Sequence, residues 1–87
     1  MQYGGIGETL GHEIMHSFDD AHISITANFK VQPSWNSAVN ETYMERTLCL
    51  IDHYMSMPFD TVRANGFSSI SEDICDNEGI KLAYKAY

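Results

Sequence analysis

The sequence has few basic residues, few cysteines and no long apolar run. Five lysines and arginines stand against twelve acidic residues, so the 87-residue chain carries a formal charge of −7 at pH 7. This balance disfavours nucleic acid and anionic membranes as partners and suits a divalent cation. The longest uninterrupted apolar stretch, Leu48 to Ile51, is too short to cross a bilayer, and the first residues lack the basic and apolar regions of a signal peptide. We therefore expect no signal, no transmembrane segment and no direct membrane insertion by this segment.

The two cysteines, Cys49 and Cys75, do not define a disulfide pattern, because they could pair with each other, stay free or have partners elsewhere. The composition, with 44% hydrophobic and 20% charged residues, is nevertheless that of a folded domain. The chain contains no internal repeat, low-complexity tract or linker. We predict one domain spanning residues 1–87, with a thin core.

Three stretches show helical periodicity. The first runs from about Gly7 to Asp19, after a Gly4-Gly5 breaker. The second begins near Pro33 or Ser34, where proline suits a first helical turn, and ends at Pro58. The third starts around Ser69, after an Asn65-Gly66 turn signal, and continues towards Tyr87. We predict a mainly α fold with three helices and a loop or short hairpin.

The loop or hairpin falls between Asp20 and Pro33, where Ile23, Ile25 and Ala27 alternate with polar residues as in a short strand.

Apolar stripes are expected to form the core, and the stripe of the second helix is interpreted as packing surface rather than as a cofactor pocket. The stripes are Ile6, Leu10, Ile14 and Phe18 in the first helix, and Met44, Leu48, Ile51 and Met55 in the second.

The first helix carries an H-E-x-x-H pattern, His12-Glu13-Ile14-Met15-His16. The i, i+4 spacing places both imidazoles on one face, so one helical turn provides two zinc ligands. Glu13 lies beside that face, where a general base could reach a water on the metal. A catalytic zinc needs a third protein ligand, and Glu72 is the candidate because Asp76 follows four residues later on the same face. Asp76 is suited to orient a ligating histidine.

Each of these signals also has a structural interpretation. H-E-x-x-H occurs on ordinary helices, where its side chains are simply solvated. Ser69-x-x-Glu72 can be a capping box at a helix start. Asp19 and Asp20 could orient the other histidine, whereas His22 and His53 have no partner at ligand spacing and are interpreted as surface or loop residues. The combination of the two segments favours the metal site.

The similarity extends well beyond the five-residue pattern. Tyr3-Gly4-Gly5-Ile6-Gly7 and Gly11-His12-Glu13-Ile14-Met15-His16-Ser17-Phe18-Asp19-Asp20 resemble the zinc helix of the neprilysin and endothelin-converting-enzyme family of zinc metalloendopeptidases, which are gluzincins. Glu72-Asp73-Ile74-Cys75-Asp76-Asn77-Glu78-Gly79 and Ala83-Tyr84-Lys85-Ala86-Tyr87 resemble the family's E-x-x-x-D segment and the helix after it. The resemblance spans nearly the whole chain.

This resemblance implies part of a thermolysin-like metallopeptidase catalytic domain that hydrolyses peptide bonds in oligopeptides. It implies one zinc ion per chain, bound by His12, His16 and Glu72, with Glu13 as the base and Asp76 as an assisting acidic residue. Members are typically membrane-anchored with the catalytic domain outside the cell, which implies an extracellular or plasma-membrane ectodomain. Peptides are the implied partners, and the oligomeric state is left open.

Departures from the family pattern leave an alternative. Ser71 and Glu78 stand where the family has glycines, and Cys75 replaces a small residue. The family's upstream Asn-Ala segment and its downstream His and Arg, which stabilise the oxyanion, have no counterpart in the 87 residues. Oxyanion donors contribute about two to three orders of magnitude in rate. The alternative is a catalytically impaired or inactive zinc-binding fragment of the same family, and a third hypothesis is a helical domain without metal.

Overall fold

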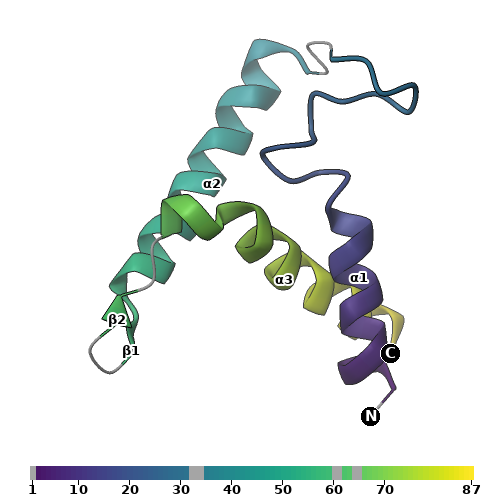
Figure 1. Cartoon of the computed structure of the whole chain (residues 1–87), viewed down its shortest axis with the longest axis vertical. Helices are drawn as coiled ribbons and strands as arrows, with labels where there is room; N and C mark the ends of the chain where they lie inside the picture. Colours follow the sequence, from purple (N-terminus) through teal and green to yellow (C-terminus); the bar gives the residue numbers. More distant parts are fainter. Residues whose placement is uncertain (1, 32–34, 60–61, 64–65) are drawn as a thin grey trace. The chain divides into compact units, whose positions relative to one another are not determined.

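The computed structural model describes residues 2–31, 35–59, 62–63 and 66–87 (Figure 1). Two compact units are present: one combines Met1–Ile23 with Ser71–Tyr87, and the other is Ser24–Ile70. The predicted class, mainly α with three helices and a loop or short hairpin, is confirmed. The elements are the π-helical turn η1 (Tyr3–Gly7), α1 (Glu8–Met15), α2 (Ser37–Ser56), β1 (Pro58–Phe59), β2 (Val62–Arg63) and α3 (Gly66–Ala86).

The first helix continues through the glycines that were expected to break it. The wide turn η1 runs directly into α1, and the N–H of Gly7 donates to the carbonyl of Gln2 at 2.9 Å. Glycine disfavours helix, but a tertiary contact offsets this cost: the ring of Tyr3 meets the ring of Tyr87 edge-on, with centroids 5.6 Å apart. The prediction of a breaker at Gly4-Gly5 was therefore wrong.

The first helix also ends earlier than predicted, at Met15 instead of Asp19. The N–H of Phe18 donates to the carbonyl of Met15 at 2.8 Å, so the chain tightens into turns of i to i−3 type. The predicted hairpin region forms a tight turn closed by a single antiparallel bridge between Ile25 and Val31. Phe29 lies in this turn in the left-handed conformation, with φ of 58°.

The second unit contains α2 and the β1–β2 hairpin. Asn36 caps α2, because its side chain accepts a hydrogen bond from the N–H of Val39 at 3.0 Å. The predicted start at Pro33 or Ser34 lies outside the described residues. Met57 is extended, as a residue before proline prefers, which explains why α2 ends just before Pro58. The two strands pair Pro58 with Arg63 and Phe59 with Val62.

The third helix begins at Gly66, one turn before the predicted start at Ser69. Ser69 therefore lies inside α3 and not at its N-cap, so the capping-box interpretation of Glu72 is wrong. The side chain of Glu72 is directed to the histidines of α1 instead. The Asn65 half of the predicted turn signal lies outside the described residues.

In the first unit, α1 and the C-terminal half of α3 lie side by side (Figure 1). They cross at Gly11 and Gly79, where the backbones touch: a Cβ at Gly11 would lie 2.6 Å from the Gly79 carbonyl oxygen. A Cβ at Gly79 would lie 2.6 Å from the backbone nitrogen of His12. This close approach determines how far α3 lies from the histidines.

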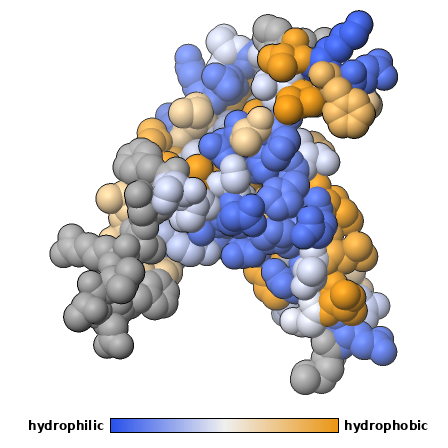
Figure 2. Space-filling view, viewed as in Figure 1, coloured by the Kyte–Doolittle hydropathy of each residue, from blue (hydrophilic) through white to orange (hydrophobic). Residues whose placement is uncertain are grey.

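The apolar stripe of α1 is exposed, against expectation. Figure 2 shows apolar side chains on the surface over α1, and Ile6, Leu10, Ile14 and Phe18 are each at least half exposed. In α2, Ile51 is buried, while the other three predicted stripe residues are exposed. The buried apolar side chains among the described residues are Ile51, Ile70, Ile74, Cys75 and Ala83, so the core is thin, as predicted. No helix in the described ranges combines the length and the hydropathy that a membrane span requires.

Candidate metal centre

The two histidines of the H-E-x-x-H pattern lie one turn apart on the same face of the first helix. Their rings meet edge-on, with centroids 4.8 Å apart and planes at 82°. The ring of His12 is 15% exposed and that of His16 is 28% exposed, so both are sheltered but reachable from solvent. Glu13, between them, is exposed. The structure thus places the pattern as its spacing predicted.

The third predicted ligand faces both histidines from α3. One carboxylate oxygen of Glu72 lies 3.1 Å from Nε2 of His12, and the other lies 3.7 Å from Nε2 of His16. Asp76, one turn later, places its Oδ1 at 2.7 Å from Nδ1 of His12. The crossing at Gly11 and Gly79 thus brings together residues that are about sixty positions apart in the sequence.

The hydrogen bonds on the outer ring nitrogens define what the inner nitrogens can do. Nδ1 of His12 contacts Asp76, and Nδ1 of His16 contacts Asp19 at 2.8 Å. A carboxylate only accepts hydrogen bonds, so both Nδ1 atoms carry the ring proton and donate. In the neutral rings, each Nε2 then presents a lone pair towards the Glu72 carboxylate. Two lone pairs and an anion then face one another, an arrangement that a bound cation satisfies.

Asp19 is the most deeply buried charged group of this cluster, with no exposed surface. Burial favours a higher pKa for Asp19, but hydrogen bonds from His16 and His22 outweigh burial and lower that pKa. The hydrogen bond to Asp19 raises the pKa of His16 above its ordinary value of 6.5, against the effect of burial, and the charge of Glu72 adds to the rise. Asp19 is therefore a carboxylate at neutral pH and a strong acceptor for His16.

Cys75 also lies against the site. It is fully buried, and its Sγ is 3.3 Å from Nδ1 of His16. Burial, reinforced by the charges of Asp19 and Glu72, raises the pKa of the Cys75 thiol to about 11, so this thiol is protonated at neutral pH. Both Cys75 and Cys49 are free.

Several groupings of side chains could hold a metal ion. Within the described ranges, three sets have all donor atoms within 4.8 Å of one another: His12, His16 and Cys75; His16, Asp19 and His22; and Glu8, His12 and Asp76. The His16 nitrogen closest to Cys75 and Asp19 is Nδ1, which already carries a proton and donates it to Asp19. The predicted set, His12, His16 and Glu72, is not one of these three, although Nε2 of His12 and Nε2 of His16 lie 3.1 and 3.7 Å from the Glu72 carboxylate oxygens. Two histidines and one carboxylate are a donor set of catalytic zinc sites.

Sequence reasoning missed the role of His22. Its Nδ1 lies 2.8 and 2.9 Å from the two carboxylate oxygens of Asp19, and its backbone N–H donates to Oδ1 at 2.8 Å. The signal available in the sequence was the spacing His16-x-x-Asp19-x-x-His22. Of the two aspartates expected near His16, Asp19 contacts it, whereas Asp20 accepts a hydrogen bond from the Ser71 hydroxyl at 2.6 Å.

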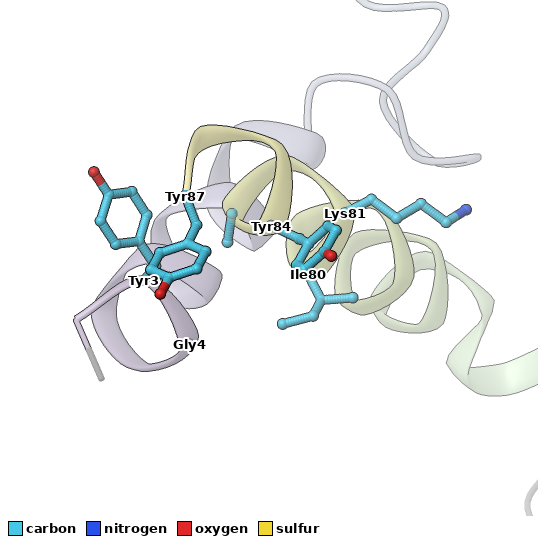
Figure 3. A pocket seen from close by; sticks show the side chains of 7 residues that line it. Tyr3, Gly4, Ile80, Lys81, Tyr84 and Tyr87 are labelled. Atoms are coloured by element: carbon cyan, nitrogen blue, oxygen red, sulfur yellow. The ribbon is translucent and has the colours of Figure 1, made fainter.

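A separate apolar pocket lies at the other end of the first unit, between η1 and the last turns of α3 (Figure 3). The rings of Tyr3 and Tyr87 lie side by side at its edge, with Ile80 and Tyr84 on the adjoining turn. None of the residues that line this pocket belongs to the histidine cluster. Its lining offers packing surface and no metal-ligating set.

Comparison with known proteins agrees with the family resemblance along the whole chain. The sequence model of Peptidase family M13 matches residues 1–87. The chain is 38% identical over 87 residues to the endothelin-converting enzyme homolog of Locusta migratoria. It is 36% identical over 90 residues to membrane metallo-endopeptidase-like 1 of Homo sapiens and 38% identical over 89 residues to neprilysin-1 of Caenorhabditis elegans. Each comparison covers 100% of this chain and 12% of the relative. The resemblance found in the motifs is therefore confirmed, and the chain belongs to peptidase family M13.

Proposed function

We propose that this chain carries the zinc-binding and water-activating centre of a zinc metalloendopeptidase, as part of one peptidase catalytic domain that includes residues 1–87. The observation that carries the proposal is the convergence of Nε2 of His12 and Nε2 of His16 on the Glu72 carboxylate. His12, His16 and Glu72 are the proposed ligands of one zinc ion. The name of the family and the names of the relatives, which include a metallo-endopeptidase, support the reaction class.

Different residues of the chain have different proposed roles in the reaction. A zinc ion at this position supplies a Lewis acid that lowers the pKa of water to about 7 and polarises a substrate carbonyl. Glu13 accepts the proton of the attacking water and later donates it to the leaving amine. Its charge contributes to the raised pKa of His16, which is consistent with a position beside the histidine face. Asp76 and Asp19 act through His12 and His16, because they hold the Nδ1 protons and so direct each Nε2 inward.

The alternative is a chain that binds zinc without turnover. Its support is the large exposure of the Glu72 side chain, which is 62%. Both candidates use the same three ligands. They differ in whether a peptide is cleaved.

The deciding experiment measures zinc stoichiometry and peptide cleavage on the same preparations of the purified chain. We expect one zinc ion per chain after dialysis, and we expect Glu72→Ala to lose most of it. Glu13→Gln keeps the zinc, since Glu13 is not a ligand, and abolishes any cleavage of an unstructured oligopeptide. Glu45→Gln, at an exposed position of α2, serves as the matched control and changes neither quantity.

The outcomes separate the hypotheses. Zinc with cleavage that depends on Glu13 supports the enzyme, and zinc without cleavage supports the non-catalytic candidate. A dialysed protein without zinc refutes both and leaves a helical domain without metal.

The nature of the substrate and the location of the protein are proposals as well. Oligopeptides are the proposed substrates, and mass spectrometry of the cleaved peptides reports the bond that is cut. An extracellular or plasma-membrane ectodomain is the proposed location. Surface labelling of intact cells that express the protein tests it, and a protein that is labelled only after lysis contradicts it.

A further inference from the structure

His22 belongs to the hydrogen-bond network of the metal centre although it contacts neither Glu72 nor the inner face of the histidines. We propose that His22 is a positioning residue that holds Asp19 against His16 and thereby directs Nε2 of His16 to the metal position. The inference rests on the proposed zinc site and deepens it. Neither the motif nor the spacing of the ligands assigns a role to this residue.

The contacts of Asp19 carry the argument. Its carboxylate receives hydrogen bonds from three groups: Nδ1 of His16, Nδ1 of His22 and the backbone N–H of His22. The His22 ring spans both oxygens, at 2.8 and 2.9 Å, whereas the His16 ring reaches only Oδ2. A donor shared between two oxygens defines the plane of the carboxylate, so the His22 ring sets the orientation in which Asp19 meets His16.

The burial of the three side chains shows where His22 lies in this chain of contacts. Asp19 has no exposed surface, while the His22 side chain is 53% exposed and that of His16 is 28% exposed. The His22 ring therefore lies on the solvent side of the carboxylate and His16 on the inner side. Without the ring, water reaches Oδ1 and Oδ2 and competes with His16 for the carboxylate, which loosens the contact that directs Nε2.

The backbone brings His22 to this place. The N–H groups of His22 and Ile23 donate to the Asp19 carbonyl at 3.3 and 3.0 Å, so a tight turn folds the chain back over Asp19. The His16 and His22 rings meet edge-on, with centroids 6.2 Å apart. The turn is local, and the substitutions proposed below change the ring while leaving the backbone N–H in place.

The chemistry of the side chain allows a sharp test. The amide nitrogen of asparagine lies two bonds beyond Cβ, as Nδ1 of histidine does, whereas the amide nitrogen of glutamine lies one bond further, at the level of Nε2. His22→Asn therefore keeps the donor to Asp19, while His22→Gln misplaces it and His22→Ala removes it. A bacterial host is required, because His22→Asn creates a glycosylation sequon with Ser24.

The experiment measures the zinc dissociation constant by chelator competition, with circular dichroism to verify that each variant is folded. We expect His22→Ala and His22→Gln to weaken zinc about tenfold, at the lower end of what partners of metal-ligating histidines contribute. We expect His22→Asn to stay within about twofold of the native chain. His53→Ala, an exposed histidine of α2, is the control for loss of a histidine as such. Equal zinc affinity in the native chain and in His22→Ala overturns the inference, as does failure of His22→Asn to restore affinity.

A second readout separates this inference from the proposed function. In the metal-free protein, long-range ¹H–¹⁵N spectra of the imidazoles report which nitrogen of His16 carries the proton. We expect Nδ1–H in the native chain and in His22→Asn, and a tautomer mixture in His22→Ala. If the native chain binds no zinc, the proposed function fails, and these spectra alone decide whether His22 positions His16: an unchanged His16 tautomer in His22→Ala overturns it.

Discussion

The helix crossing at Gly11 and Gly79 allows the assembly of the proposed metal centre to be tested by adding a single methyl group. At Gly79, an added Cβ would lie 2.6 Å from the backbone nitrogen of His12 and 2.9 Å from its Cα. Both are backbone atoms, so no side-chain rotation relieves the overlap. None of the glycines among the described residues has a positive φ, so alanine adopts the same backbone conformation and the effect is purely steric.

The size of the effect follows from these distances. An ordinary contact of a Cβ is 3.4 Å or more, so Gly79→Ala must move the two helices apart by about 0.8 Å. Overpacking of this kind costs about 1–3 kcal/mol, while alanine in a helix regains about 0.5–1 kcal/mol. We expect a net loss of about 1–2 kcal/mol in the free energy of unfolding. Because a metal site tolerates displacements of about 0.5 Å, the shift between His12 and Glu72 also weakens zinc binding.

Urea unfolding followed by far-UV circular dichroism, with a chelator present, measures the stability, and chelator competition measures the zinc affinity. Gly5→Ala is the matched control, since a Cβ there meets nothing within 4 Å. It is expected to be as stable as the native chain or more so. If Gly79→Ala behaves like Gly5→Ala in both assays, the close crossing is refuted. If Gly79→Ala is less stable but binds zinc with unchanged affinity, the close crossing stabilises the fold without determining the geometry of the metal site.

Three further predictions concern other parts of the chain. A thiol reagent at neutral pH should label one cysteine per native chain, the exposed Cys49, and should reach the buried Cys75 only after denaturation; immediate labelling of both contradicts the burial. Phe29→Asn should raise the free energy of unfolding by about 0.5–1 kcal/mol, because Phe29 has φ of 58° and a side chain 91% exposed; a decrease in urea unfolding would argue against backbone strain. Ser71→Ala should lower that free energy by about 0.5–1.5 kcal/mol, and a double-mutant cycle with Asp20→Ala that gives no coupling would refute the hydrogen bond between them.

The spacing of residues in the sequence correctly predicted which site residues share one face of a single helix. His12 and His16 share a face because a helix repeats every 3.6 residues, and Glu72 and Asp76 share a face for the same reason. The existence of all three helices followed from the same periodicity. Their ends did not, because η1 is stabilised by the Tyr3–Tyr87 contact, which no local pattern reveals.

Contacts between distant segments could not be predicted from the sequence pattern. The role of His22 depends on a turn closed by the Asp19 carbonyl, and turns of this kind leave only a weak spacing signal. The distance between α1 and α3 depends on two glycines that face each other, which the sequence presents as ordinary helix-weakening residues. The capping-box interpretation of Glu72 was wrong for a related reason, because the true start of α3 lies one turn earlier.

The side chains around the proposed metal centre are linked by polar contacts. The fully buried side chains of the described residues are Asp19 and Cys75, and no buried side-chain nitrogen or oxygen among those residues lacks a partner. A polar network of this kind costs little when every member is satisfied and costs about 1–3 kcal/mol for each buried group left unpaired. A substitution at the buried Asp19 should therefore damage the site more than the truncation of an exposed apolar residue such as Leu10. In the proposed metal centre, the carboxylates of Asp19 and Asp76 on the Nδ1 atoms direct the two Nε2 atoms of the H-E-x-x-H pattern inward.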